Sequence, residues 1–207
     1  MLASARSPEP PHIAERRVLF EDPRVATPYV ARSYLAPERN PGDQRKPAAL
    51  LLLAELLGGG TTSYMTEKLQ FEEQIAVYSG AFYRGTSLDA ISFDVVIVPN
   101  PGVSLGEAEA AMDKVLQGFI EQGVDLNALE RIKMQVRASE IYARDAVDGI
   151  AQLYGQALTS GLRVEDVQAW PELLQEITPD EIIAAAKDIW RDERSVTGYL
   201  MKAEAAQ

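Results

Sequence analysis

Three consecutive glycines, Gly58, Gly59 and Gly60, separate two apolar stretches of the chain and limit how those stretches can be arranged. Apolar residues between positions 50 and 57 recur on one face of a helix, which the glycines would end. A second helical pattern runs from position 62 to 72, and a threonine or serine at its start can cap it. The sequence therefore predicts two helices joined by a tight turn, where glycine allows close packing.

Segments in which apolar and polar residues alternate lie on either side of these helices. Such alternation is typical of strands with one buried face, and it predicts strands at residues 17–20, 29–35, 76–83, 91–98 and 195–201. The fourth of these ends in four β-branched residues, from Val95 to Val98, which favour a buried position. We therefore expect the hairpin of residues 76–98 to lie in the middle of a sheet.

Helices are predicted for most of the second half, at residues 104–122, 125–154 and 178–190. Ser104 with Glu107, and Thr178 with Glu181, have the spacing of a capping box, which marks the start of a helix. Gly149 is expected to interrupt the long middle helix. Strands near both ends with helices between them predict an α+β fold, in which helices pack on one face of a mostly antiparallel sheet.

The beginning of the chain is rich in proline. Three prolines within the first 11 residues disfavour helix and predict an extended linker over residues 1–15. We interpret residues 16–202 as a single α+β domain and residues 203–207 as a tail, because 207 residues are enough for one domain with a large core. A linker at this position also predicts that the domain was cut from a longer protein.

The net charge of −11 and the absence of cysteine exclude several classes of protein. A strongly acidic chain repels nucleic acid and anionic membranes, so neither is an expected partner. Without cysteine there are no disulfides and no thiolate ligands for a metal. No apolar run approaches the roughly 20 residues needed to span a bilayer. The composition therefore predicts a soluble domain with no nucleic-acid partner and no membrane span.

No catalytic residues and no metal ligands can be assigned from the sequence. A zinc site needs about three protein ligands and depends on imidazole or thiolate, but the single histidine, His12, lies in the proline-rich linker. A serine nucleophile needs a neighbouring base, and His12 offers none. Glu72 and Glu73 point about 100° apart on a helix, so they cannot share a proton as a catalytic pair does.

The glycine run could instead hold an anion, since free N–H groups at the start of a helix favour negative charge. A phosphate-binding loop of this kind needs a lysine directly after its last glycine, and no lysine follows the run before Lys68. A tight structural turn is the better interpretation. An anion-binding enzyme that uses residues 58–60 is the weakest of three functional hypotheses.

The glycine run and the residues after it resemble the pattern of a known enzyme family. The shared features are Leu57 with the three glycines, then Ser63, Leu69 and the Ile75-Ala76 pair. The likeness covers residues 16–202, and it continues through the helices that begin near Ser104, Asp125 and Thr178. The chain resembles the C-terminal, inactive domain of the insulinase/pitrilysin-type zinc metallopeptidases, which include the processing peptidases.

This resemblance implies one half of a peptidase whose two similar halves close around a chamber. In that family the other half carries a His-x-x-Glu-His zinc motif, which is missing here, so zinc would lie in the N-terminal half of the parent protein. The chain would be inactive alone, and the parent would be a zinc-dependent endopeptidase. Its implied partners are the zinc-bearing half, a homologous partner subunit in a bacterial heterodimer, and a peptide substrate. Relatives of this type are often exported, which implies a periplasmic or cell-envelope location.

Two positions at the junction between the second helix and the following strand depart from the family pattern. Many members have an arginine and a tyrosine there that hold the substrate, and this chain has Gln70 and Val77 instead. Glutamine lacks the charge and the fork of guanidinium, and valine has no donor. Tyr78 is expected on the opposite face of the strand. Tyr83 and Arg84 remain as further candidate substrate contacts.

A partner chain could supply the missing arginine and tyrosine, which keeps the peptidase hypothesis first. The second hypothesis is a non-catalytic scaffold or binding subunit of the same fold, like the core subunits of the respiratory cytochrome complex. The region upstream of Met1 in the parent gene discriminates between them. A His-x-x-Glu-His motif there predicts a peptidase, and its absence predicts a scaffold.

Overall fold

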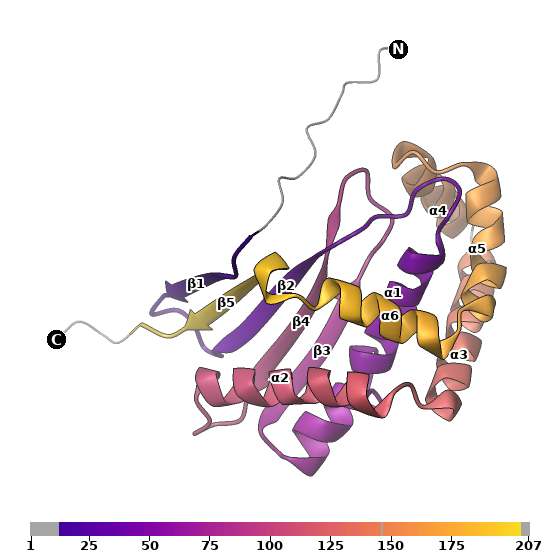
Figure 1. Cartoon of the computed structure of the whole chain (residues 1–207). Coiled ribbons are helices and arrows are strands. Elements are labelled where there is room, and N and C mark those ends of the chain that lie inside the picture. Colours follow the sequence, from indigo (N-terminus) through magenta and orange to yellow (C-terminus); the bar gives the residue numbers. More distant parts are fainter. Residues whose placement is uncertain (1–12, 146, 204–207) are drawn as a thin grey trace.

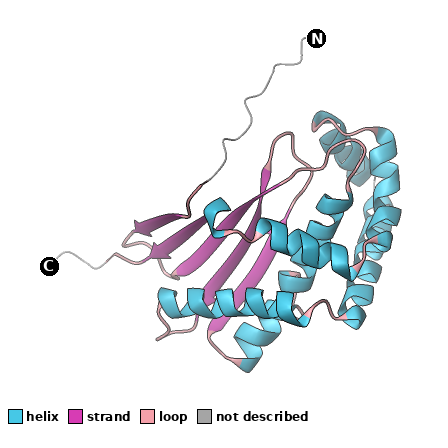
Figure 2. Ribbon diagram, in the orientation of Figure 1, coloured by secondary structure: helices cyan, strands magenta, loops and turns pink. Residues whose placement is uncertain are grey.

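A five-stranded sheet supports the fold in the computed structural model, which describes residues 13–145 and 147–203 (Figures 1 and 2). The strands lie in the spatial order β1-β5-β2-β4-β3. Their bounds are Arg16–Glu21 (β1), Tyr29–Ala36 (β2), Ala76–Tyr83 (β3), Ile91–Pro99 (β4) and Ser195–Met201 (β5). β1 pairs with β5 in parallel, and the other pairs are antiparallel. The first and last strands of the chain therefore form one edge of a mostly antiparallel sheet.

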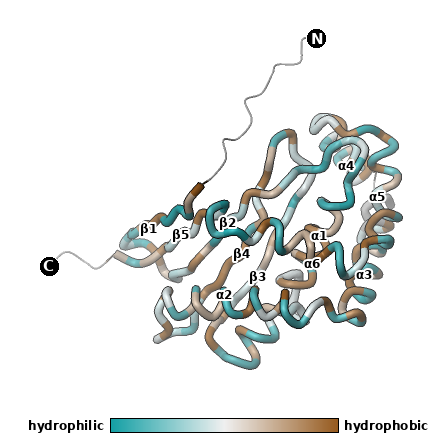
Figure 3. The backbone as a smooth tube through the Cα atoms, viewed as in Figure 1, coloured by the Kyte–Doolittle hydropathy of each residue, from teal (hydrophilic) through white to brown (hydrophobic). Residues whose placement is uncertain are grey.

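All five predicted strands are confirmed, each bound to within one residue. The expected central position of the hairpin is wrong for its first strand, because β4 lies inside the sheet while β3 is its edge. The β-branched run that favoured burial belongs to β4, a strand with a hydrophobic stretch in Figure 3. Most of the predicted linker, with His12, and residues 204–207 lie outside the described residues.

The helices pack on one side of the sheet, which confirms the predicted α+β class (Figure 2). Their bounds are Arg45–Gly58 (α1), Thr66–Glu72 (η1), Leu105–Gln122 (α2), Leu126–Asp145 (α3), Val147–Thr159 (α4), Val164–Glu176 (α5), Pro179–Ile189 (α6) and Asp192–Arg194 (η2). Both predicted capping boxes are formed, at the starts of α2 and α6. The predicted long helix corresponds to α3 and α4, and residue 146 between them lies outside the described residues. Gly149, where an interruption was expected, lies inside α4.

Two helices differ from the sequence prediction. The segment after the glycines is a π-helix, η1, and Ser63 does not cap it, because its hydroxyl donates to the Thr66 side chain at 2.9 Å. α5 is not predicted by any of the patterns above. It starts without a serine or threonine cap, although the Arg163 N–H donates to the Asp166 carboxylate at 2.8 Å, and it contains Pro171, a residue that disfavours helix interiors.

The core lies between the sheet and α1, which is buried almost all round. A helix that is apolar on every side belongs in the interior of a protein, and α1 contacts β3, α6, α3 and α5. The largest fully buried side chains of this core include Leu50, Leu53 and Leu57 from α1 together with Phe93, Ile97, Met112 and Ile182. Because the helices cover only one face of the sheet, the other face is left open.

Gly58 allows the end of α1 to lie directly against β3. A Cβ atom placed on Gly58 would lie 1.9 Å from the Ala81 nitrogen and 2.7 Å from the Gly80 Cα. The close partner of this glycine is therefore a strand, and not the second helix that the sequence suggested. The turn continues with Gly60 at φ +147, a conformation that L residues rarely adopt.

A buried charge cluster joins the other end of the sheet to α2. Arg32 on β2 is 5% exposed, and its guanidinium donates to Glu109 at 2.5 Å and to Thr197 on β5 at 2.9 Å. It also pairs with Asp113. Arg17 on β1 donates to the same Glu109 carboxylate at 3.1 Å. These contacts, here called the Arg32 cluster, connect three strands to one helix.

The Arg32 cluster keeps Glu109 ionised. Burial by itself raises the pKa of this carboxyl group, but hydrogen bonds from Arg17, Tyr199 and Arg32 lower the pKa below its ordinary value of 4.5. A carboxyl group whose pKa is lower in the folded than in the unfolded state stabilises the protein at pH values above the unfolded-state pKa. This stability is lost as the pH falls through the folded-state pKa. The cluster therefore stabilises the fold at neutral pH and weakens in acid.

Substitution of Gly58 by alanine is expected to destabilise the protein by about 3 kcal/mol, because the new methyl group meets the backbone of β3, which cannot move aside. The matched control is Gly106→Ala in α2, where nothing lies within 4 Å of the added Cβ. That change should stabilise by about 0.5 kcal/mol. Urea unfolding at neutral pH measures both values, and a mild effect of Gly58→Ala would contradict the close contact.

Arg32→Met is expected to cost about 3 kcal/mol at pH 7, because Glu109 stays buried after losing a charged partner. The control Arg24→Met removes an exposed pair with Asp22 and should have a much smaller effect, because water screens that pair. Unfolding measured below pH 4.5 should show a smaller difference between Arg32→Met and the unchanged protein. A difference that stays constant with pH would contradict the assigned role of the Glu109 charge.

Candidate functional site

The junction between η1 and β3 holds Gln70 on the covered side of the sheet. Its side-chain amide donates to the Ser79 hydroxyl at 3.0 Å and to the Thr66 hydroxyl at 3.3 Å. Ser79 is 2% exposed and faces the helices. The amide of Gln70 is therefore held by neighbouring side chains and does not point to the open face.

The same hydrogen bonds connect the junction to the glycine turn. The Thr66 hydroxyl donates to the Gly60 carbonyl at 3.1 Å and accepts from Ser63. The π-helix ends where the Glu73 N–H donates to the Lys68 carbonyl at 2.9 Å. Gln74 follows with φ +52, a left-handed conformation that turns the chain into β3. Gly60, Thr66, Gln70 and Ser79 form one polar network that fixes the direction of the strand.

A β-bulge at the start of β3 changes the face on which Tyr78 lies. Ala76 pairs with Pro99 and Tyr78 pairs with Val98, so two steps on β3 match one step on β4. Val77 is the extra residue. Val77 and Tyr78 are 53% and 45% exposed, whereas Ala76 and Ser79 on either side are buried. The expectation that Tyr78 points away from Val77 is therefore wrong, because the bulge puts both side chains on the open face.

The uncovered side of the sheet, here called the open face, is mostly apolar. Alternation along the paired strands assigns to it Val18, Phe20, Tyr29, Ala31, Ser33, Leu35, Val77, Tyr78, Gly80, Phe82, Ser92, Asp94, Val96, Val98, Val196, Gly198 and Leu200. The Tyr78 and Phe82 rings lean toward each other over Gly80, whose Cβ would lie 2.8 Å from the tyrosine hydroxyl. Apolar surfaces of this extent on soluble domains mark binding sites.

Tyr83 and Arg84, at the far end of β3, have different surroundings. Tyr83 is 5% exposed, and its hydroxyl donates to the Pro37 carbonyl at 2.6 Å. Burial raises the pKa of this tyrosine well above its ordinary value. Arg84 is exposed, and with Phe82 and Asp94 it lines a cavity of about 340 Å³. Of these two candidates, only Arg84 presents its polar group to solvent.

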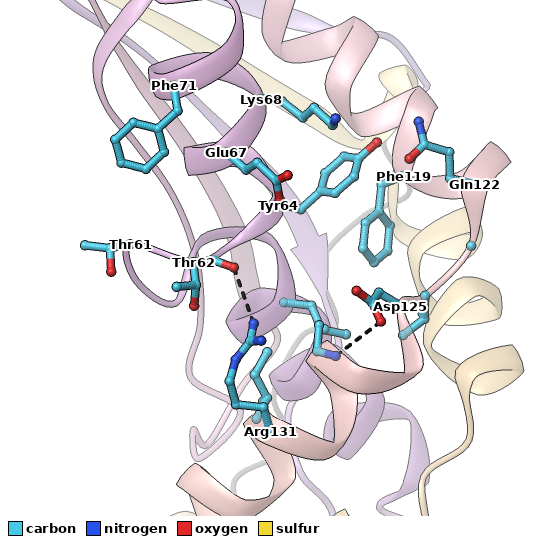
Figure 4. Close-up of a pocket in the computed structure, with 15 residues that line it drawn as sticks. Thr61, Thr62, Tyr64, Glu67, Lys68, Phe71, Phe119, Gln122, Asp125 and Arg131 are labelled. Carbon is cyan, nitrogen blue, oxygen red and sulfur yellow. Dashed lines mark hydrogen bonds between the residues drawn. The ribbon is translucent and has the colours of Figure 1, made fainter.

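A cavity of about 660 Å³ lies beside the glycine turn on the helical side of the molecule (Figure 4). Its walls carry Glu67 and Asp125 as well as Lys68, whose ammonium is paired with Glu72 at 2.7 Å. Arg131 donates to the Thr62 carbonyl at 3.5 Å. The Glu67 and Asp125 carboxylates oppose the charges of Lys68 and Arg131, so the lining has no excess of positive charge that would favour a phosphate.

The described residues contain no group of three His, Cys, Asp or Glu side chains that could hold a metal ion. Within the same residues no helix is long and apolar enough to cross a membrane. Among the residues that line the open face, Phe82 and Asp94 were not identified from the sequence. The signal was present, because both lie one step from buried residues on paired strands.

Gln70→Ala is expected to destabilise the protein by about 2 kcal/mol, because the buried Ser79 and Thr66 hydroxyls lose their common donor. The control is Gln117→Ala on α2, an exposed glutamine whose amide bonds only to Glu121. It should cost less than about 0.5 kcal/mol. Thermal and urea unfolding of both variants test this, and equal effects would show that Gln70 has no structural role.

Comparison with known structures identifies the same architecture in several bacterial proteins. A protease from Helicobacter pylori superposes with a TM-score of 0.84 at 19% identity, over 97% of this chain and 47% of that one. The M16 inactive domain from Pseudomonas fluorescens superposes with a TM-score of 0.72 at 16% identity, over 100% of this chain and 47% of that one. The first half of the periplasmic protease PqqL from Escherichia coli superposes with a TM-score of 0.77 at 15% identity, over 96% of this chain and 44% of that one. The chain thus spans about half the length of these structures.

Sequence comparison gives the family directly. A search among curated proteins finds no match, but residues 3–136 match the family described as the Peptidase M16 inactive domain. The match covers the glycine turn, the η1–β3 junction and most of the sheet, and it confirms the resemblance to the zinc metallopeptidases stated from the sequence. The chain therefore belongs to the M16 peptidase family, as an inactive domain.

Proposed function

We propose that this chain is the non-zinc half of a zinc peptidase subunit, and that its open face forms one wall of a chamber that holds an extended peptide. The observation that carries the proposal is the open face itself. It is a mostly apolar sheet surface, with Tyr78 and Phe82 exposed near one edge. A large exposed apolar surface of this kind is typical of a site that binds a partner or a ligand.

The position of β3 favours a peptide as the occupant. β3 is the last strand of the sheet, so its outer edge has backbone N–H and C=O groups without a strand partner among the described residues. An extended peptide can pair with such an edge, and alternate side chains then lie on one face. On the open face they would meet Val77, Tyr78 and Phe82.

The catalytic groups would come from elsewhere in the assembly. Gln70 is held by Ser79 and Thr66, and Val77 has no donor, so neither can bind a substrate carbonyl as an arginine and a tyrosine would. A zinc-bearing N-terminal half would supply the metal, and a homologous partner subunit would supply the arginine and tyrosine. The length of the Helicobacter pylori protease, about twice that of this chain, supports a missing half. The periplasmic PqqL supports a location outside the cytoplasm.

Purified alone, the chain is expected to leave a model peptide uncut with or without added zinc, as measured by mass spectrometry. It should still bind an extended apolar peptide, and Tyr78→Ala with Phe82→Ala should weaken that binding about tenfold through the loss of two aromatic contacts. Tyr142→Ala, an exposed tyrosine on α3, is the control and should not change binding.

Two results would contradict this proposal. Zinc-dependent cleavage by the isolated chain would show that it contains its own catalytic site. A lack of any peptide binding would remove the open face as a chamber wall. The region upstream of Met1 in the parent gene gives an independent test, because a His-x-x-Glu-His motif must be present there.

A non-catalytic scaffold is the second candidate, and the junction favours it. Gln70 and Val77 leave the chain without a donor at the position where a peptidase of this family holds its substrate. In a scaffold the open face would be covered permanently by another subunit, and free peptides would not compete for it. Peptide binding measured on the isolated chain therefore separates the two functions. Calorimetry with inorganic phosphate, expected to give no heat, tests the anion-binding alternative.

A further inference from the structure

The cavity of about 340 Å³ lies at the end of the open face where β3 joins β4. Phe82 and Asp94 are direct cross-strand neighbours in the register, and both line this cavity together with Ser92 and Arg84. An aromatic ring and a carboxylate therefore stand side by side on an otherwise apolar surface. This pairing is the feature from which the inference is drawn.

Asp94 has the one negative charge among the strand residues of the open face defined above. Its carboxylate accepts a hydrogen bond from the Ser92 hydroxyl at 2.8 Å. Among the side chains that the structure describes, no lysine or arginine forms an ion pair with it. The carboxylate is half-buried, so its charge is screened less by water than a fully exposed group would be. A cation from outside the chain is the missing partner.

Phe82 adds a preference for a cation on a long apolar stem. Phe82 is 47% exposed and lies beside the carboxylate. Lysine and arginine place their methylene stems on apolar surfaces while the charged head reaches a polar group, and an aromatic ring attracts the head as well. Strands lie about 4.8 Å apart, so a peptide paired with the outer edge of β3 is about two such spacings from Asp94. Only a long side chain can cross Phe82 to reach it.

Arg84 limits how much positive charge the cavity accepts. It lines the same cavity, but it is exposed and therefore strongly screened by solvent. Its guanidinium can donate to a peptide carbonyl, and it disfavours a second basic residue close by. Arg84 therefore weakens the negative electrostatic potential at the Asp94 carboxylate but does not make it positive.

We propose that this cavity binds the side chain of a lysine or arginine in an extended peptide that lies along β3. The inference rests on the proposed function, because it assumes that the open face holds a peptide. It adds the chemical class of the residue that is recognised. Asp94 selects for the positive charge of the bound side chain, and Phe82 contacts its methylene stem. Arg84 disfavours a second basic residue of the peptide close to the first.

The test uses the full chain and a pair of fluorescein-labelled peptides with alternating valines, which differ only in a central lysine or norleucine. Fluorescence anisotropy should give about tenfold tighter binding of the lysine peptide, as expected for one charge-assisted hydrogen bond. Asp94→Asn should reduce this preference to near one while leaving the norleucine peptide unaffected. Arg84→Gln should strengthen binding of the lysine peptide. Circular dichroism melting verifies that both variants are folded, and asparagine keeps an acceptor for Ser92.

Equal binding of the two peptides would overturn this inference and leave the proposed function standing. A lysine preference that survives Asp94→Asn would also overturn it, because the selection would then come from another group. If neither peptide binds the chain, the proposed function fails together with the inference.

Discussion

The direct contact between the end of α1 and β3 is the constraint on which the rest of the structure depends. α1 is apolar on all sides, so it must be enclosed, and Gly58 lets its last turn meet the backbone of β3 with no side chain between them. The chain then has to reverse within a few residues. The glycine turn, the π-helix η1 and the left-handed Gln74 are the successive parts of that reversal. Together they place β3 at the edge of the sheet in a fixed register.

The two edges of the sheet are attached to the helices in different ways. At the β1–β5 edge, the buried Arg32 and Glu109 and the exposed Arg17 connect the strands to α2 through ion pairs. This edge unites both ends of the described chain and is fixed. At the other edge, β3 is attached through η1 and the polar network of Gln70, and its outer side has no strand beside it among the described residues. Tyr78 and Phe82 are exposed at that second edge, and Phe20 of β1 is exposed at the first.

The sequence predicted the structure best where an element depends on residues that are close together along the chain. The capping boxes of α2 and α6, and all five strands, follow from local signals and agree with the structure. The sequence did not predict α5, because the start of this helix lacks a serine or threonine cap and Pro171 disfavours a helix. The β-bulge could not be read from the sequence, since it is set by the pairing of β3 with β4. For the same reason the sequence located Gln70 and Val77 correctly at the junction but could not give the direction of either side chain or of Tyr78.

The junction and the open face divide the polar groups of this region into two sets. At the junction, the Gln70 amide and the Thr66 and Ser79 hydroxyls bind one another, so their hydrogen-bonding capacity is used to hold the fold. On the open face, the Tyr78 hydroxyl has no hydrogen-bond partner among the described residues, and the Asp94 carboxylate has only Ser92. A buried network is needed for stability, whereas unpaired groups on an apolar surface add nothing to folding. The polar groups of the open face are therefore free to bind a ligand, and the bulge at Val77 matters because it turns Tyr78 toward that face.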